Sequence, residues 1–128
     1  MPLILNIDTA MASAHVSIAK DGILLQECIN AITKDHSSFL QVAIKKLLTS
    51  LQIDIQQIDA IAVTQGPGSY TGLRVGMAAA KGLCYAINKP LITINTLEAL
   101  AASALDDLNI KSSSVLLSPM IDARRMEV

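Results

Sequence analysis

Apolar positions along the chain recur with two different periods, and these periods predict the order of its strands and helices. Short apolar or alternating runs are typical of strands, whereas recurrence at i, i+3 and i+4 indicates an amphipathic helix. The runs that predict strands are Leu3–Thr9, Ser13–Lys20, Ile23–Ile29, Asp59–Gln65, Leu91–Ile94 and Val115–Ile121. The patterns that predict helices cover His36–Gln52, Leu73–Asn88 and Thr96–Leu108.

The residues between these runs indicate how the elements connect. Asp21-Gly22 lies between the second and third strand-like runs and is typical of a two-residue hairpin. Asp35 or Ser37 is expected to cap the first helix, and Thr96 the third. A three-strand antiparallel meander followed by alternating helices and strands predicts an α/β fold, with a mixed sheet and helices on its faces.

Composition narrows the class of protein. The chain has 128 residues, of which 52% are hydrophobic and 16% charged, so it is long and apolar enough to bury a core and disorder is excluded. Cys28 and Cys84 form no metal or redox motif and indicate buried free thiols in a reducing compartment. With no signal peptide and no apolar stretch near the ~18 residues of a membrane span, we expect a soluble, cytoplasmic protein.

Charge limits the partners. The formal net charge is −1 and there is no basic run, so the sequence lacks the electrostatic footprint of an independent nucleic-acid binder. RNA would be bound only with the help of a partner. The high apolar content indicates that some apolar surface meets another chain.

A glycine-rich loop, residues 66–72 (GPGSYTG), lies between a predicted strand and a predicted helix. Its glycines would let the backbone approach a phosphate at the helix N-terminus, or would form a tight turn capped by Ser69 or Thr71. The loop lacks the lysine of a Walker A motif and the spacing of the dinucleotide fingerprint. Asp8, at the end of the first strand, would hold Mg²⁺ or a water molecule, or would form an Asx turn. The candidate nucleotide or phosphate contacts are Asp8, Gly66, Gly68, Ser69 and Gly72.

No pattern of metal ligands is present. The two histidines, His15 and His36, have no second histidine or carboxylate at helical metal spacing, and no GxSxG nucleophile elbow occurs. We therefore expect no bound metal in this chain, while composition leaves a Ser/His/Asp triad open as an alternative.

The first two predicted helices form a candidate partner surface. Apolar side chains of the first span an arc of about 180°, wider than the ~100° stripe that covers a sheet. The less buried side of the second carries only two charges, Arg74 and Lys81. We predict that these helices bind a partner and pair as a homodimer in isolation; the alternative is that long side chains simply lie along the sheet. The predicted interface residues are Phe39, Leu40, Ala43, Leu47, Leu48, Arg74, Met77, Ala78, Lys81 and Tyr85.

Four segments together resemble the TsaB (YeaZ) family, also known as glycoprotease or peptidase M22 homologues. They are LNIDTA at 5–10, DAIAVTQ at 59–65, GPGSYTGLRVG at 66–76 and IDAR at 121–124. The resemblance implies a ribonuclease H-like lobe of the actin-like ATPase superfamily. It also implies a cytoplasmic role in making N6-threonylcarbamoyladenosine at position 37 of ANN-reading tRNAs. In that family the chain is the non-catalytic paralogue of TsaD, the ATPase TsaE joins the pair, and ATP and metal belong to the partner subunits.

One departure from the catalytic relatives supports this assignment. TsaD-like proteins carry an HxxxH metal motif after the strand that follows the glycine-loop helix, and the matching positions here are Thr96 and Leu100. Leucine cannot bind a metal and a lone hydroxyl is a poor ligand for a transition metal. The alternative function is a free-standing ATP-binding or glycoprotease-like enzyme of the same fold.

The resemblance also divides the chain. Residues 1–112 would form the N-terminal lobe, and 113–128 the first strand and hairpin of a truncated second lobe. Ile7-Asp8 is echoed by Ile121-Asp122, as expected if each lobe opens with a strand and an aspartate. We expect the strand at 115–121 to complete the sheet irregularly or to pair with another copy, because proteins avoid unpaired sheet edges.

Overall fold

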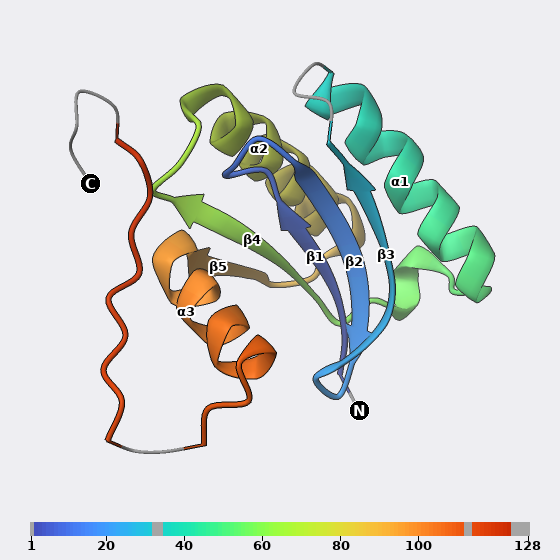
Figure 1. The fold of residues 1–128 in the computed structure, drawn as a ribbon. Helices are drawn as coiled ribbons and strands as arrows, with labels where there is room; N and C mark the ends of the chain where they lie inside the picture. Colours follow the sequence, from blue (N-terminus) through green and yellow to red (C-terminus); the bar gives the residue numbers. More distant parts are fainter. Residues whose placement is uncertain (1, 32–34, 112–113, 124–128) are drawn as a thin grey trace.

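A five-stranded mixed sheet organises the protein, as seen in a computed structural model that describes residues 2–31, 35–111 and 114–123 (Figure 1). The strand order is β3-β2-β1-β4-β5, with antiparallel pairing within the β1–β3 meander and parallel pairing of β4 with both β1 and β5. The strands are β1 (Leu3–Asp8), β2 (Ala14–Lys20), β3 (Ile23–Asn30), β4 (Ala60–Gly66) and β5 (Leu91–Asn95). The helices are α1 (His36–Leu51), η1 (Ile55–Gln57), α2 (Tyr70–Ile87) and α3 (Thr96–Asp107).

Helices cover the two faces of the sheet unequally. On one face α1 packs against β2 and β3, and α2 against β4 and β1; α3 lies on the other face, against β4 and β5 (Figure 1). Alternate residues of β1 and β2 are buried toward α1 and α2, as an amphipathic strand requires. The predicted α/β architecture is therefore confirmed, and the face of β1–β3 opposite α1 and α2 carries polar side chains, such as those of His15 and Ser17, beside exposed Leu24 and Ile29.

Local turn chemistry confirms the predicted hairpin turn and one of the predicted helix caps. Asp21 and Gly22 have φ of 53° and 77°, the left-handed pair of a type I′ hairpin. Ser69 caps α2, because its Oγ accepts the Gly72 amide at 3.2 Å. The prediction for α3 is wrong by one residue: the Asn95 side chain accepts the amides of Leu97 and Glu98 at 2.9 and 3.3 Å. Thr96 is instead buried.

The cap of α1 and the cysteines complete this comparison. Asp35 is the N-cap residue of α1 but makes no side-chain capping hydrogen bond, because it adopts a left-handed conformation with φ 65°. Cys28 and Cys84 are both free thiols, as predicted, but only Cys84 is buried and Cys28 is half-buried. Burial raises the pKa of the Cys84 thiol above its usual value.

The prediction of a strand at 115–121 is wrong for this structure. The segment forms no strand, and Leu116 is 97% exposed. It runs outside the sheet, beyond α3 (Figure 1). A strand needs a hydrogen-bonding neighbour and a covered face, and within the described ranges this segment has neither. The predicted hairpin after Ala123 lies outside the described residues, as does Arg124 of the IDAR motif.

Three predicted interface residues of α1 are core residues instead. Leu40, Ala43 and Leu47 are exposed by 1%, 2% and 0%, within one cluster that includes Leu5 and Ile61. Phe39 and Leu48 are half-buried against the same cluster. The wide apolar arc of α1 is explained by its position, since the helix packs against β2, β3 and α2 at once. None of the helices described here is long and apolar enough to cross a membrane.

Candidate functional site

The glycine-rich loop is tied to the end of β1 by hydrogen bonds within the chain. The Ser69 amide donates to the Ala10 carbonyl at 2.7 Å, and the hydroxyl of buried Thr9 donates to the Gly72 carbonyl at 2.6 Å. The amide of Gly72 is taken by the Ser69 side chain, and that of Leu73 by the Ser69 carbonyl at 2.8 Å. The amides of Ser69, Gly72 and Leu73 are therefore bonded inside the protein rather than directed at a phosphate.

The glycines themselves serve this close packing. A Cβ at Gly68 would overlap Ala10, and a Cβ at Gly72 would overlap the Thr9 carbonyl oxygen. One turn further along α2, a Cβ at Gly76 would overlap the Thr9 hydroxyl. The missing side chains thus let α2 approach the β1–β2 turn closely.

Asp8 forms the Asx turn that was one of its two expected roles. Its Oδ1 accepts the Ala10 amide at 3.1 Å and the Thr64 hydroxyl at 3.0 Å. The carboxylate therefore links β1, the following turn and β4, and this arrangement needs no ligand.

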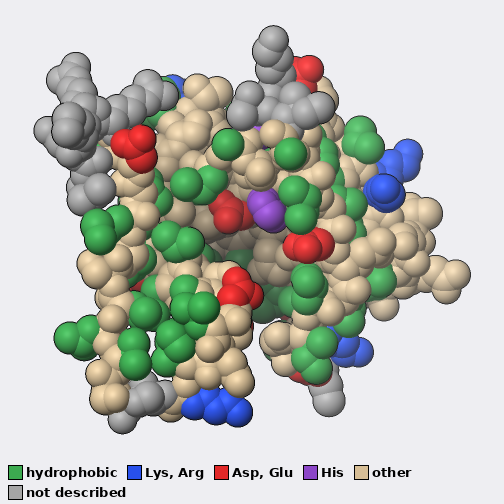
Figure 2. All heavy atoms as spheres, viewed as in Figure 1, with side chains coloured by type: hydrophobic (Ala, Val, Ile, Leu, Met, Phe, Trp, Pro, Cys, Tyr) green, Lys and Arg blue, Asp and Glu red, His purple; other side chains and the backbone are tan. Residues whose placement is uncertain are grey.

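Asp8 and the glycine loop line different hollows. A hollow of about 750 Å³ is bounded by the loop, by residues 10–12 and 121–123, and by His36. Asp8 lines another of about 210 Å³ on the open face of the sheet, with Asn6, His15 and Ser17. Figure 2 shows a histidine and acidic side chains gathered around a depression on this face. Asp8 and the loop thus line separate hollows, and contact of Asp8, Gly66, Gly68, Ser69 or Gly72 with a nucleotide or phosphate stays a prediction.

Replacing Asp8 should affect stability according to the hydrogen bonds that survive. Asp8→Ala removes the acceptor for two donors, and we expect the free energy of unfolding to fall by about 1–2 kcal/mol in urea titrations. Asp8→Asn keeps an oxygen acceptor and should cost less than about 1 kcal/mol. As a control, Asp107→Ala on the exposed end of α3 should stay within about 0.5 kcal/mol. Equal losses for the alanine and asparagine variants at position 8 would contradict this role.

The positions that match the HxxxH motif lie at the start of α3. Thr96 is buried there, and Leu100 follows one turn later at 45% exposure. In the described part of the chain, no group of three or more His, Cys, Asp or Glu side chains could hold a metal ion. The expectation that the chain binds no metal has no direct test in the structure and stays a prediction.

The exposed side of α1 and α2, here called the helix surface, comprises Gln41, Val42, Lys45, Lys46, Tyr70, Arg74, Ala78, Lys81 and Tyr85. Of the predicted interface residues, four are exposed on this surface: Arg74, Ala78, Lys81 and Tyr85, the last by 92%. Met77, which was also predicted, is half-buried. Val42 and Tyr70, exposed by 67% and 74%, were not predicted. Val42 does not stand out from the apolar pattern of the first helix, and Tyr70 belongs to the glycine-rich loop in the sequence. The sequence therefore marks neither residue as part of an exposed helix surface.

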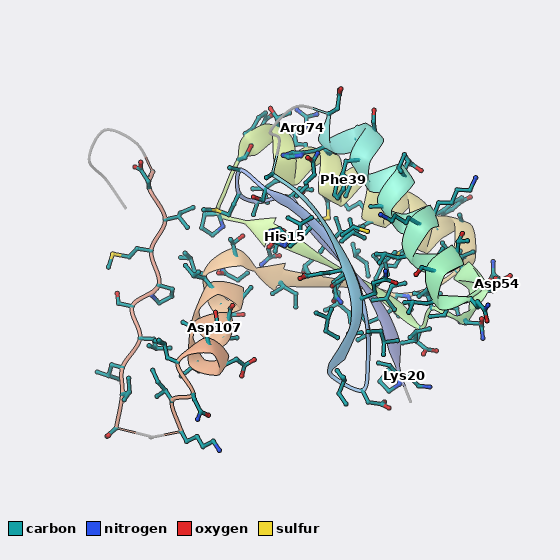
Figure 3. The ribbon with its side chains drawn as sticks, turned by 45° about the vertical axis from the view of Figure 1, so that its right-hand side comes forward. His15, Lys20, Phe39, Asp54, Arg74 and Asp107 are labelled. Atoms are coloured by element: carbon teal, nitrogen blue, oxygen red, sulfur yellow. The ribbon has the colours of Figure 1, made fainter. Side chains whose placement is uncertain are left out.

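A groove of about 440 Å³ crosses the helix surface between the two helices. Ser37 and Gln41 line it from α1, and Arg74 and Ala78 from α2. The Arg74 guanidinium donates to the Tyr70 hydroxyl at 2.8 Å and lies 5.4 Å from the centre of its ring, so its side chain is held in place. Figure 3 shows Arg74 near Phe39, where α1 and α2 begin.

Comparison with known proteins identifies the family. The family model of TsaD, tRNA N6-adenosine threonylcarbamoyltransferase, matches residues 24–128. The TsaB protein of Bacillus subtilis, named for tRNA threonylcarbamoyladenosine biosynthesis, is 34% identical over 125 residues, 98% of this chain and 52% of its own length. A tRNA N6-adenosine threonylcarbamoyltransferase of Staphylococcus haemolyticus is 35% identical, over 73% of this chain and 32% of its own.

Solved structures agree with this result. YeaZ of Pseudomonas aeruginosa superposes with a TM-score of 0.80 at 28% identity, over 85% of this chain and 51% of that one. RuvC of Thermus thermophilus superposes at 0.55 with 12% identity over 91% of this chain and 84% of that one, which shows the shared ribonuclease H-like fold alone. The chain spans about half the length of the curated TsaB relatives that it matches, 52% in Bacillus subtilis and Escherichia coli. Taken together, these matches show that the chain belongs to the TsaD family, as a member of its TsaB (YeaZ) branch.

Proposed function

We propose that this chain is a non-catalytic subunit that pairs with a TsaD-type protein in forming N6-threonylcarbamoyladenosine on tRNA. The observation that carries the proposal is the internal use of the glycine loop and Asp8, both of which bond and pack against the chain itself. A loop held this way suits a scaffold better than a nucleotide cradle. The exposed helix surface offers a place for the partner.

The remaining components follow from the same proposal. ATP and metal belong to the TsaD-type subunit and to a TsaE-type ATPase, because the positions of the paired metal ligands hold Thr96 and Leu100 here. The tRNA is contacted through the complex, and the complex works in the cytoplasm. In isolation, two copies of the chain associate through the helix surface.

Reconstitution tests this function. Purified TsaD-type and TsaE-type proteins of the same organism are incubated with unmodified tRNA, ATP and an activated threonylcarbamoyl donor, with and without this chain, and modified adenosine is quantified. We expect modification to fall at least about tenfold when the chain is left out, as expected for an obligatory partner. Undiminished modification without the chain would contradict the proposal.

Calorimetry separates the alternative of a free-standing enzyme. The isolated chain, titrated with Mg-ATP, is expected to show no binding at micromolar concentration. Tight binding accompanied by ATP turnover would favour the free-standing enzyme.

A further inference from the structure

Basic side chains are concentrated on one layer of the protein. α1 and α2 carry four of them, Lys45, Lys46, Arg74 and Lys81, and all four are exposed. Neither helix contains an aspartate or glutamate, although the chain has 11 acidic residues and a formal net charge of −1. The sequence hides this asymmetry because the four cations are spread over residues 45–81, and only the packing of α1 beside α2 brings them to one surface.

The shape of the same surface suits a protein helix. Small residues, Ala78, Gly82 and Ala86, recur every four positions on the exposed side of α2 and leave room for close approach. The groove between Gln41 and Ala78 is of a size to take a partner's side chain. Arg74 stands at its rim, already oriented by Tyr70, so binding orders it at little further entropic cost.

We propose that the helix surface docks onto an acidic surface of its protein partner, with carboxylates placed opposite Lys45, Arg74 and Lys81. The inference rests on the proposed function, in which that partner is the TsaD-type subunit, and adds the chemistry by which the partner is recognised. Complementary charges across an interface raise the association rate and exclude wrong partners. In this account charge, more than apolar area, selects the partner.

A second copy of the chain is the less favourable occupant. A twofold axis brings the same patch of both copies together, so four cations on each copy would face four on the other. RNA is also disfavoured, because four cations with Ala78, Gly82 and Tyr85 between them make few phosphate contacts. The two protein complexes therefore differ in the sign of their salt dependence: salt weakens the complex with an acidic partner and strengthens self-association.

The test measures the affinity of this chain for the TsaD-type protein of the same organism at 50 and 500 mM NaCl. For the wild type, we expect the dissociation constant to rise about tenfold with salt, as several partly exposed ion pairs are screened. Arg74→Glu/Lys81→Glu should raise it at least about tenfold at low salt, and should abolish most of the salt effect. Circular dichroism confirms that the variant is folded.

A matched charge reversal controls for net charge. Lys20→Glu/Lys111→Glu makes the same change at exposed positions outside the helix surface, and Figure 3 shows Lys20 at the end of the molecule away from Arg74. This control should bind as the wild type does. An interface with no salt dependence and no effect of Arg74→Glu/Lys81→Glu would overturn the inference while leaving the proposed function intact.

Two further outcomes are decisive. If the wild type forms no complex with the TsaD-type protein at either salt concentration, both the function and the inference fail. If the reversal leaves that affinity unchanged but abolishes binding of the chain to tRNA, the surface recognises RNA and the inference is wrong. Light scattering of the wild-type chain alone tests the opposite salt dependence, because its self-association should increase as the salt concentration rises.

Discussion

Gly76→Ala is expected to lower the free energy of unfolding by about 3 kcal/mol, at the upper end of the range for overpacking a core. The added Cβ would overlap the hydroxyl of Thr9, which is completely buried and bonded to the Gly72 carbonyl at 2.6 Å. Neither group can move away without breaking that bond or separating α2 from β1. Urea unfolding followed by circular dichroism measures the loss.

Gly82→Ala is the matched control in the same helix. A Cβ at Gly82 meets no atom within 4 Å, so the substitution should stabilise by about 0.5–1 kcal/mol through helix propensity alone. A double-mutant cycle identifies the clash itself. In a Thr9→Ala background the nearest remaining atoms lie at 3.5 and 3.6 Å, and Gly76→Ala should then cost less than about 1 kcal/mol. Equal effects at positions 76 and 82 would show that packing against Thr9 is not the reason for the glycine.

Leu47→Ala is the other substitution expected to have a large effect, a loss of about 3–4 kcal/mol. Leu47 is fully buried between α1 and the sheet, in the same cluster as Leu5, Ile7 and Val16. Truncating it leaves a cavity that surrounding strands cannot fill. Thermal or urea unfolding measures the change.

Val42→Ala separates core from surface on the same helix. Val42 is 67% exposed, so its truncation should change the free energy of unfolding by less than about 0.5 kcal/mol. If Leu47→Ala were instead harmless to folding but abolished partner binding, the assignment of Leu47 to the core would be wrong, and the original prediction of Leu47 as an interface residue would be restored.

Most of the fold is legible in the sequence because local signals and packing agree. The alternation of β2, the Asp21-Gly22 turn and the apolar spacing of α1 each match the observed element to within a residue or two. The prediction of a strand at 115–121 is wrong for a physical reason. Its sequence favours a strand, but a strand forms only where a neighbouring strand can pair with it. Tertiary context also explains why part of the interface prediction for α1 is wrong: its wide apolar arc packs against three elements of the same chain rather than against a partner.

The candidate site was less predictable, because the sequence shows residue types but not which atoms fill the space beside them. The sequence contains the same glycines at 68, 72 and 76 whether a phosphate packs against them or, as observed, Thr9 and Ala10 do. The basic layer cannot be seen in the sequence for a related reason, since exposed Lys45 and Lys81 come to lie on neighbouring helices only after α1 packs beside α2. Asp8 illustrates the favourable case, where an Asx turn was one of two stated alternatives and the geometry shows it, while the role of Asp8 toward Mg²⁺ or a water molecule stays a prediction.

We propose that this chain works through its helix surface and not through a site of its own, and one measurement tests this most directly. The initial rate of threonylcarbamoyladenosine formation is compared in the reconstituted system for the wild type, Asp8→Asn and Arg74→Glu/Lys81→Glu. Each of the three is present at the same concentration, near the dissociation constant of the wild-type chain for the TsaD-type protein. We predict a rate for Asp8→Asn within about twofold of the wild type, and a loss of at least about fivefold for the helix-surface variant. A rate abolished by Asp8→Asn in a folded chain, with the helix-surface variant fully active, would contradict the account.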